Sequence, residues 1–312
     1  MTSPGAVMPD EEAFVVLKAA LAAGVNLWSG ADFYGTPDNN SLHLAARYFA
    51  KYPEDADKVV LSIKSGIIDM RTLTIDGSPQ NVRKAVTNAN KILNGYKKID
   101  VFGICRVDHK VPIEDTVCAE AELVKAGEIG SIQLSEAGET TIRRAAAVAD
   151  IALVEDEASL WTPEVFENGV AAACGELGIA LVAHTPLGAG MLTGNVKTVA
   201  DLPAGHLRAF PRFQPGNFDK NRSLVLELEK LAQVKGVSTA RLALSWLKLQ
   251  SRKPGTAVVI PVAGARSAER IKDNAETTEL SSEDLEAISA ILKSNVVHGT
   301  RYPEAGMNLV EY

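Results

Sequence analysis

Short apolar runs alternate with longer amphipathic stretches along the whole chain. The short runs, rich in Val, Ile and Leu, predict seven buried strands. They span residues 25–28, 58–63, 99–105, 129–134, 151–154, 179–183 and 256–260. Continuous apolar strands of this kind are typical of parallel sheets covered by helices, so an α/β fold is expected.

The stretches around these strands predict helices, because their apolar residues recur at helical spacing. The helices are expected over residues 11–23, 41–52, 81–93, 113–126, 140–148, 165–177, 221–235, 239–250, 267–276 and 282–293. Gly24, Gly127 and Gly178 follow three of them as stop signals. The segment from Thr185 to Phe218 is rich in Gly and Pro and is expected to be a long loop.

Two kinds of parallel sheet fit this alternation. A doubly wound sheet usually carries a glycine-rich phosphate turn after its first strand, and none is present there. The nearest glycine cluster, Gly188, Gly190 and Gly194, lies late in the chain and does not have the GxGxxG spacing. Length and regular alternation therefore favour a single (β/α)8 TIM barrel over residues 1–312, with one of its eight strands unaccounted for.

The composition indicates which partners and which cellular location this protein is expected to have. The 312 residues are 46% hydrophobic with a formal net charge of −7, and this balance argues against nucleic acid or an anionic membrane as partner. Three cysteines without CxxC spacing indicate a reducing, cytoplasmic location, and no metal is expected. No apolar run approaches the ~20 residues of a membrane helix, and the first residues do not read as a signal peptide.

Candidate chemistry gathers where the strands end, as barrel chemistry does. Tyr34 follows the first predicted strand and Lys64 ends the second. A nearby ammonium lowers the pKa of a tyrosine from about 10, so that the phenol can give a proton to an alkoxide forming on a carbonyl carbon. The alternatives are a packing or hydrogen-bonding role for Tyr34 and an ordinary surface position for Lys64.

Several longer stretches resemble the aldo-keto reductase family over nearly the whole chain. They are HTPLGAGMLTG from His184, FPRFQPGNFDKN from Phe210 and IPVAGARSAERIKDN from Ile260. The wording of residues 40–64 is most similar to the family's fungal pyridoxal reductase branch. The resemblance implies a TIM barrel of the aldo-keto reductase type. It also implies NADPH-dependent reduction of a small-molecule aldehyde, pyridoxal to pyridoxine being the favoured case.

The resemblance also assigns catalytic positions. It implies that Tyr34 is the proton donor and that Lys64 tunes it. Ser29 and Cys105 stand where the family has an Asp that anchors the Lys and a His that orients the carbonyl. Asp32 could replace the lost carboxylate if the turn brings it inward; the alternative is that it faces solvent.

Cofactor and substrate positions follow from the same resemblance. Ser135, Glu136 and Glu155 match the positions that hold the nicotinamide carboxamide, with carboxylates where the family has amides, and His184 matches the residue that stacks on the ring. The pyrophosphate loop corresponds to Thr185, Leu187, Gly188 and Gly190, and the 2′-phosphate region to Gly264, Arg266, Arg270 and Asn274. The two arginines also fit a reading as solvated surface charge. Trp28, Trp161 and the tail residues Arg301 and Tyr302 are candidates for the substrate pocket.

One departure concerns the first strand of the family, which is preceded by a hairpin. This chain begins after that segment, so a seven-stranded barrel lacking the N-terminal hairpin and first strand is expected. Its two edges, at residues 25–28 and 256–260, would be unpaired, which predicts low stability. A second hypothesis is therefore a catalytically impaired cofactor-binding or regulatory homologue, favoured by Ser29 and Cys105. The sequence gives no indication of oligomeric state.

Overall fold

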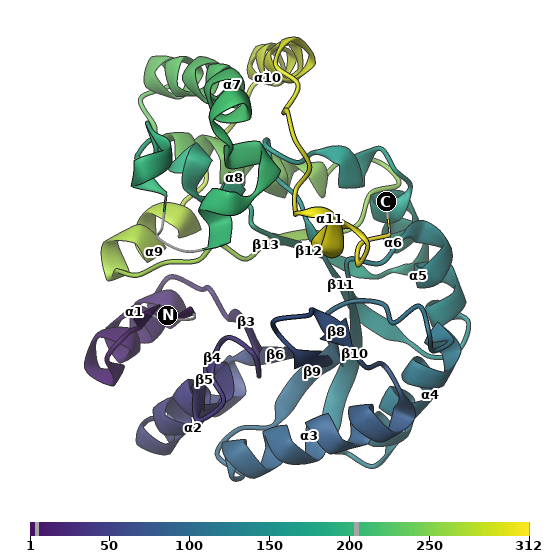
Figure 1. The fold of residues 1–312 in the computed structure, drawn as a ribbon. Helices are drawn as coiled ribbons and strands as arrows, with labels where there is room; N and C mark the ends of the chain where they lie inside the picture. Colours follow the sequence, from purple (N-terminus) through teal and green to yellow (C-terminus); the bar gives the residue numbers. More distant parts are fainter. Residues whose placement is uncertain (4–5, 203–205, 312) are drawn as a thin grey trace.

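The computed structural model describes residues 1–3, 6–202 and 206–311, and it contains one curved parallel sheet of seven strands. Along the sheet the order is β13, β12, β11, β10, β9, β6, β3 (Figure 1). The strands are β3 (Leu27–Ala31), β6 (Val60–Ser65), β9 (Ile99–Ile104), β10 (Ile129–Ser135), β11 (Ile151–Glu157), β12 (Ala180–His184) and β13 (Val259–Pro261). All seven predicted strands are confirmed, and the architecture is of the (β/α)8 barrel type.

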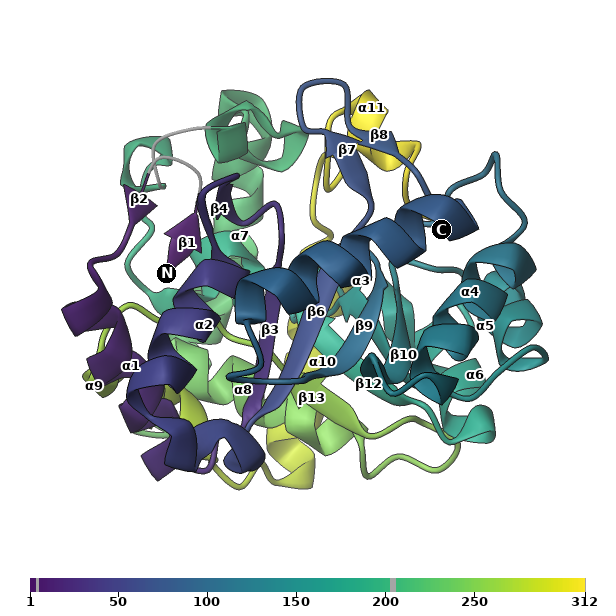
Figure 2. The same ribbon diagram turned by 90° about the horizontal axis from the view of Figure 1, so that it is seen from below.

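Helices surround the sheet, and most of them cover its outer face (Figures 1 and 2). They are α1 (Asp10–Ala22), α2 (Ser41–Lys51), α3 (Pro79–Leu93), α4 (Ile113–Lys125), α5 (Glu139–Ala146), α6 (Val170–Leu177), α7 (Pro215–Val234), α8 (Thr239–Gln250), α9 (Ala268–Ala275), α10 (Ser282–Ser294) and α11 (Glu304–Met307). Three short antiparallel pairs complete the strands: β1 (Thr2–Ser3) with β2 (Ala6–Val7), β4 (Gly35–Thr36) with β5 (Asn39–Asn40), and β7 (Ile67–Asp69) with β8 (Thr74–Ile75). Residues 203–205 of the predicted loop lie outside the described residues.

Several element boundaries differ from the sequence prediction, among them those of α7, α6 and β11. Helix α7 begins at Pro215 because proline is accepted in a first turn, where its missing N–H would be unpaired anyway. Helix α6 begins only at Val170, because Gly169 has a φ of 95° and interrupts the helical run. Strand β11 continues to Glu157 instead of ending at residue 154. Glu155 is therefore a strand residue held in register with β10 and β12.

The sheet is open on one side. Within the described residues, β3 and β13 are the two ends of the sheet order, which confirms the predicted unpaired edges. The expectation of no N-terminal hairpin needs correction, since β1 and β2 form a short pair, but that pair is separate from the barrel sheet. Helices α1 and α9 contact each other on this side (Figure 1). Ile271 of α9 joins the apolar cluster that contains Phe14 and Leu17 of α1, so the helical layer bridges the gap.

A small apolar cluster holds the two edge strands in place from within. Val101, Leu153 and Val182, on β9, β11 and β12, form its buried centre. Leu27 of β3 and Ile260 of β13 pack against that centre. Because side chains from well-separated strands meet here, the cluster fills the inside of the curved sheet. The two edge strands are thereby positioned by packing although they do not pair with each other.

Candidate active site

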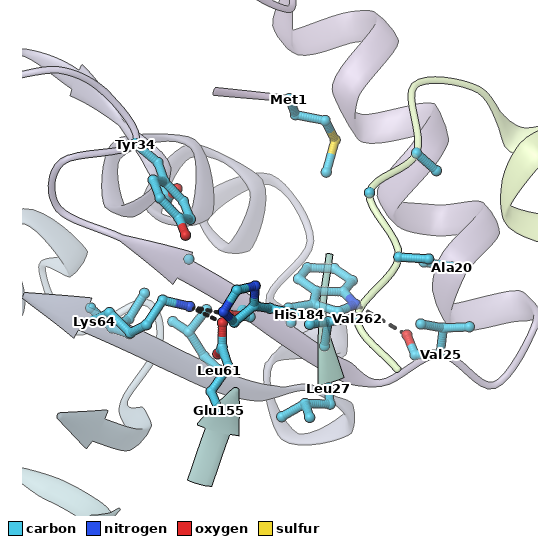
Figure 3. Close-up of a pocket in the computed structure, with 18 of the residues that line it drawn as sticks. Met1, Ala20, Val25, Leu27, Tyr34, Leu61, Lys64, Glu155, His184 and Val262 are labelled. Carbon is cyan, nitrogen blue, oxygen red and sulfur yellow. Dashed lines mark hydrogen bonds and ion pairs between the residues drawn. The ribbon is translucent and has the colours of Figure 1, made fainter. Parts of the chain in front are cut away.

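A cavity of about 580 Å³ opens at the carboxyl ends of the strands and runs along the open side of the barrel (Figure 3). One part of its wall, which we call the polar half, includes Tyr34, Lys64, Arg106, Glu155, His184 and Tyr302. The other part, which we call the open half, includes Met1, Val16, Leu17, Ala20, Val25 and Ile271. Chemistry is expected at the polar half, because it alone brings a phenol, an ammonium and a carboxylate to one space.

The loop after β3 presents Tyr34 to this cavity. Gly35, next to it, has a φ of 126°, and a Cβ there would lie 2.3 Å from the carbonyl oxygen of Asn39, so the turn requires glycine. Asn40 caps α2 and also donates from its side chain to the carbonyl of Asp32 at 2.8 Å. These constraints fix the conformation of the loop. Tyr34 itself remains accessible and is 39% exposed.

Lys64 lies near the end of β6, where it is buried and closely bonded. Its Nζ donates to Ser29 Oγ at 2.8 Å and forms an ion pair with Glu155. Burial alone would lower the pKa of Lys64, but the charge of Glu155 raises it above its ordinary value, so the side chain is an ammonium. The Nζ atom lies 5.6 Å from the centre of the Tyr34 ring. The structure thus brings the predicted Tyr–Lys pair together.

Glu155 crosses the inside of the barrel to reach this pair. One carboxylate oxygen pairs with Lys64, and the other accepts a hydrogen bond from Ser29 Oγ at 2.9 Å. Burial would raise the pKa of the Glu155 carboxyl, but Lys64 holds it below the usual value. Both oxygens already have partners within the chain, which is a different environment from the carboxamide contact predicted for this residue.

Asp32 neither replaces the carboxylate that would anchor Lys64 nor faces solvent, the two alternatives left open by the sequence. Its carboxylate turns away from solvent and accepts a hydrogen bond from Ser65 Oγ at 2.5 Å. Burial raises the pKa of Asp32 above its ordinary value. Asp32 is therefore turned inward but bonds to Ser65, and the carboxylate that pairs with Lys64 is Glu155.

After β9, the residue that reaches the cavity is Arg106 and not the predicted Cys105. Cys105 is 1% exposed, and burial raises the pKa of its thiol to about 12. The cavity wall is formed instead by Arg106, whose guanidinium donates to the Cys105 carbonyl and lies 5.7 Å from the Tyr302 ring centre. Sequence reasoning missed Arg106 as a cavity residue, although it follows directly after a predicted strand.

Glu136 belongs to a second buried ionic network. Its Oε1 lies 2.5 Å from His184 Nε2, and its Oε2 accepts from Arg301 at 2.6 Å. Arg301 also donates to Glu157 at 3.4 Å. Burial would raise the pKa of Glu136, but His184 and then the arginines hold it well below its usual range. This carboxylate therefore anchors the C-terminal tail and His184, while the tail residue Tyr302 reaches the cavity wall.

Glu136, Glu157 and His184 also have the composition of a metal site. One ligand atom from each lies within 4.8 Å of the others. The guanidinium of Arg301 donates to both carboxylates, however, and so already supplies the positive charge. An ion-pair network accounts for this group of residues without a metal.

The remaining predicted cofactor residues fall into two groups. Ser135, Thr185 and Gly264 line the cavity. Leu187 precedes the 3-10 turns η3 (Gly188–Thr193) of the adjoining loop, and Gly188 and Gly190 lie within them. The φ values of Gly188 and Gly190 are 56° and 102°, so this loop needs its glycines.

The two predicted pocket tryptophans are placed differently. Trp28 lines the cavity, and its Nε1 donates to the carbonyl of Val25 at 3.1 Å. Trp161 is 1% exposed in the core and stacks on Phe213. A Cβ at Gly188 would lie 3.0 Å from Trp161, so this tryptophan packs beneath the glycine loop and is not among the cavity-lining residues.

The N-terminal end of α9 carries the residues predicted to bind a 2′-phosphate. Arg266, just before the helix, is exposed, Arg270 in its first turn is half-buried, and Ser267 between them caps the helix. Asn274, on the same helix, is 9% exposed, and neither its amide nitrogen nor its oxygen has a hydrogen-bond partner among the described residues. Because an unbonded buried amide is costly, this side chain fits a site completed by a polar ligand.

Comparison with known proteins agrees with this geometry. The sequence pattern of the Aldo/keto reductase family matches residues 1–293. The chain belongs to the aldo/keto reductase family, and it is therefore an oxidoreductase of a kind that uses a nicotinamide cofactor. None of the helices in the described part of the chain has the length and apolarity to cross a membrane.

Individual relatives cover most of the chain. "Probable pyridoxal reductase 2" of Schizosaccharomyces pombe is 40% identical over 94% of this chain and 89% of its own length. "Probable aldo-keto reductase 1" of Glycine max is 34% identical over 95% of this chain and 83% of its own length. Among solved structures, the glycerol dehydrogenase of Gluconobacter oxydans superposes with a TM-score of 0.80 at 25% identity, covering 95% of this chain and 89% of the other.

Proposed function

We propose that this protein reduces an aldehyde to an alcohol with NADPH, and that pyridoxal is the first substrate to test. The observation that carries the proposal is the placement of Tyr34 and the charged Lys64 at one cavity wall, 5.6 Å from ring centre to Nζ. The name of the Schizosaccharomyces pombe relative supports the choice of pyridoxal.

The residues present fit a nicotinamide dinucleotide, which when bound supplies the hydride. Ser135 and His184 on the cavity wall would hold its nicotinamide end, and Thr185 beside them would contact its pyrophosphate. Arg266 and Arg270, at the start of α9, would bind its 2′-phosphate, because guanidinium groups pair strongly with phosphate. The unbonded amide of Asn274 on the same helix supports this placement.

Tyr34 acts in this proposal as the general acid. Its hydroxyl gives a proton to the carbonyl oxygen as that oxygen gains charge. The Lys64 ammonium stabilises the phenolate that remains, and the buried position strengthens this effect because little water screens the charge. Arg106 is the cationic donor on the wall near Tyr302 and would hold the substrate oxygen in place of the buried Cys105.

The second candidate function is a regulatory or cofactor-binding homologue with little turnover. The observation that favours it is the burial of Cys105, since the residue at the position of the family's carbonyl-orienting histidine does not reach the described cavity wall. This reading predicts that NADPH binds and is not consumed.

Purified protein mixed with NADPH and pyridoxal separates the two. The reductase proposal predicts loss of the nicotinamide absorbance together with formation of pyridoxine, and a slower reaction with NADH. Tyr34→Phe serves as the control for background oxidation. NADPH binding seen by fluorescence, with no consumption across a panel of aldehydes, would contradict the reductase proposal and support the regulatory one.

A further inference from the structure

Lys64 needs a counter-charge, because an ammonium this deeply buried is unstable alone. The carboxylate that supplies it comes from β11, although β10 and β9 lie between β11 and β6 in the sheet. The Lys64–Glu155 contact therefore spans the inside of the barrel. Ser29 completes the triangle, since its hydroxyl accepts from Lys64 and donates to Glu155.

We propose that Glu155 is a positioning residue, which keeps Lys64 charged and aimed at Tyr34 with Ser29 as the bridge. This assignment rests on the proposed reductase function. It gives Glu155 a task different from holding a cofactor amide, since both of its oxygens are bonded within the chain. The short chain of contacts Glu155, Lys64, Tyr34 then links β11 to the proton donor.

The groups that face this contact are few. Tyr34 and Cys105 act on Lys64 besides Glu155, and His184 acts on Glu155. Cys105 is a neutral thiol because its pKa lies near 12. Removal of the Glu155 charge therefore leaves Lys64 without a carboxylate partner, and burial then disfavours its ammonium form.

A substitution at Ser29 should compensate for the loss of the Glu155 charge. Its Oγ lies 2.8 Å from Lys64 Nζ, so an aspartate in its place would put a carboxylate at the same ammonium. With Glu155 still present, that aspartate would face another carboxylate, because Ser29 Oγ and Glu155 Oε2 are 2.9 Å apart. Like charges at this distance disfavour each other. Ser29→Asp should thus be harmful alone and restorative only together with Glu155→Gln.

The test titrates the Lys64 side chain by NMR in cofactor-free protein, and measures steady-state kinetics against pH. In Glu155→Gln, Lys64 should titrate below the ordinary lysine value of about 10.4, whereas in the wild type it should remain charged beyond it. The kcat should fall about 10²-fold, the lower end of what general acid catalysis contributes, with the Kd for NADPH almost unchanged. The alkaline limb of the kcat profile should move to lower pH.

Two further variants control the result. Glu120→Gln makes the same substitution at a buried carboxyl of α4 that does not line the cavity and whose pKa burial raises well above its usual value. It controls for the loss of a buried carboxyl and should leave the Lys64 titration and kcat as in the wild type. The double variant Ser29→Asp/Glu155→Gln should recover the Lys64 titration and most of kcat.

Unchanged Lys64 titration in Glu155→Gln would overturn the assignment, and so would a large loss of NADPH affinity with kcat kept. A wild type inactive with every nicotinamide cofactor would instead contradict the proposed reductase function. The titration needs no cofactor, so it would still decide the Lys64–Glu155 assignment in that case.

Discussion

The polar half and the open half of the cavity are built by different forces. In the polar half, charged groups such as Lys64, Glu155 and Arg106 are fixed by directional hydrogen bonds and ion pairs. In the open half, side chains such as Leu17 and Ile271 close the space by apolar packing between α1 and α9. Hydrogen bonds and ion pairs fix the positions of the reacting groups, as acid–base chemistry needs, whereas apolar packing is non-directional and tolerates change.

This difference makes the two halves separable by experiment. Changes in the polar half should alter the rate or the stability through charge. Changes in the open half and on nearby α9 should alter cofactor affinity and melting temperature while the chemical step is kept.

The largest effect is expected from Tyr34→Phe. The substitution keeps the ring and removes the proton, so kcat should fall by about 10²–10⁴-fold while NADPH affinity is nearly kept. Steady-state kinetics and a direct binding titration check both parts. A fall in kcat smaller than about 10-fold, well below that range, would mean that Tyr34 is not the donor.

Arg301→Met tests the second ionic network of the polar side. Loss of the guanidinium leaves Glu136 and Glu157 buried without this partner, so the free energy of unfolding should fall by about 3–5 kcal/mol. Urea unfolding measures it. Arg143→Met, which breaks an exposed pair with Glu139, is the matched control and should cost at most about 1 kcal/mol. Equal losses in the two variants would contradict the buried network.

The same network predicts that the stability of the folded protein falls at acidic pH. The pKa of Glu136 is lowered in the folded protein from 4.5, so its contribution is present above that value and is lost as pH falls toward the folded value. The wild type should therefore lose stability steeply below about pH 4.5, and Arg301→Met should lose less over this range. Parallel curves for the two proteins would show that Arg301 does not hold that pKa down.

Arg270→Ala tests the α9 side. A hydrogen bond to a charged group contributes roughly 1.5–3 kcal/mol, so NADPH binding should weaken by about that amount and NADH binding should hardly change. Fluorescence titration with both cofactors gives the comparison. Arg252→Ala, at an exposed arginine beyond α8, is the control. Equal weakening of the two cofactors by Arg270→Ala would exclude a 2′-phosphate role.

The smallest effect is expected from an added strand. An extended apolar segment placed ahead of Met1 would have two unpaired parallel edges to join, on β3 and β13. Each kcal/mol gained should raise the melting temperature by about 2–4 °C, and NADPH binding should tighten. A Gly/Ser segment of equal length is the control. Equal melting temperatures for both additions would show that the helical layer already closes this side.

The sequence by itself determined the fold class and the strand count. It also identified Tyr34 and Lys64 at successive strand ends, because strand and helix periodicity are local and the ends of parallel strands share one edge. The unpaired edges at β3 and β13 followed from the same count. Boundaries such as the start of α7 at Pro215 were less accurate, since proline and glycine there admit either loop or helix.

Only the tertiary structure decided the partners of the charged groups. The Lys64–Glu155 pair joins residues 91 positions apart, and Arg301 meets Glu136 across 165 positions. Such contacts depend on how far the sheet curls and on which side of each strand faces inward. A one-residue shift in the end of β11 would turn Glu155 away from Lys64, because successive side chains of a strand point to opposite faces. The packing of the loops that follow the strands likewise places Trp161 in the core and brings Arg106, rather than Cys105, to the cavity wall.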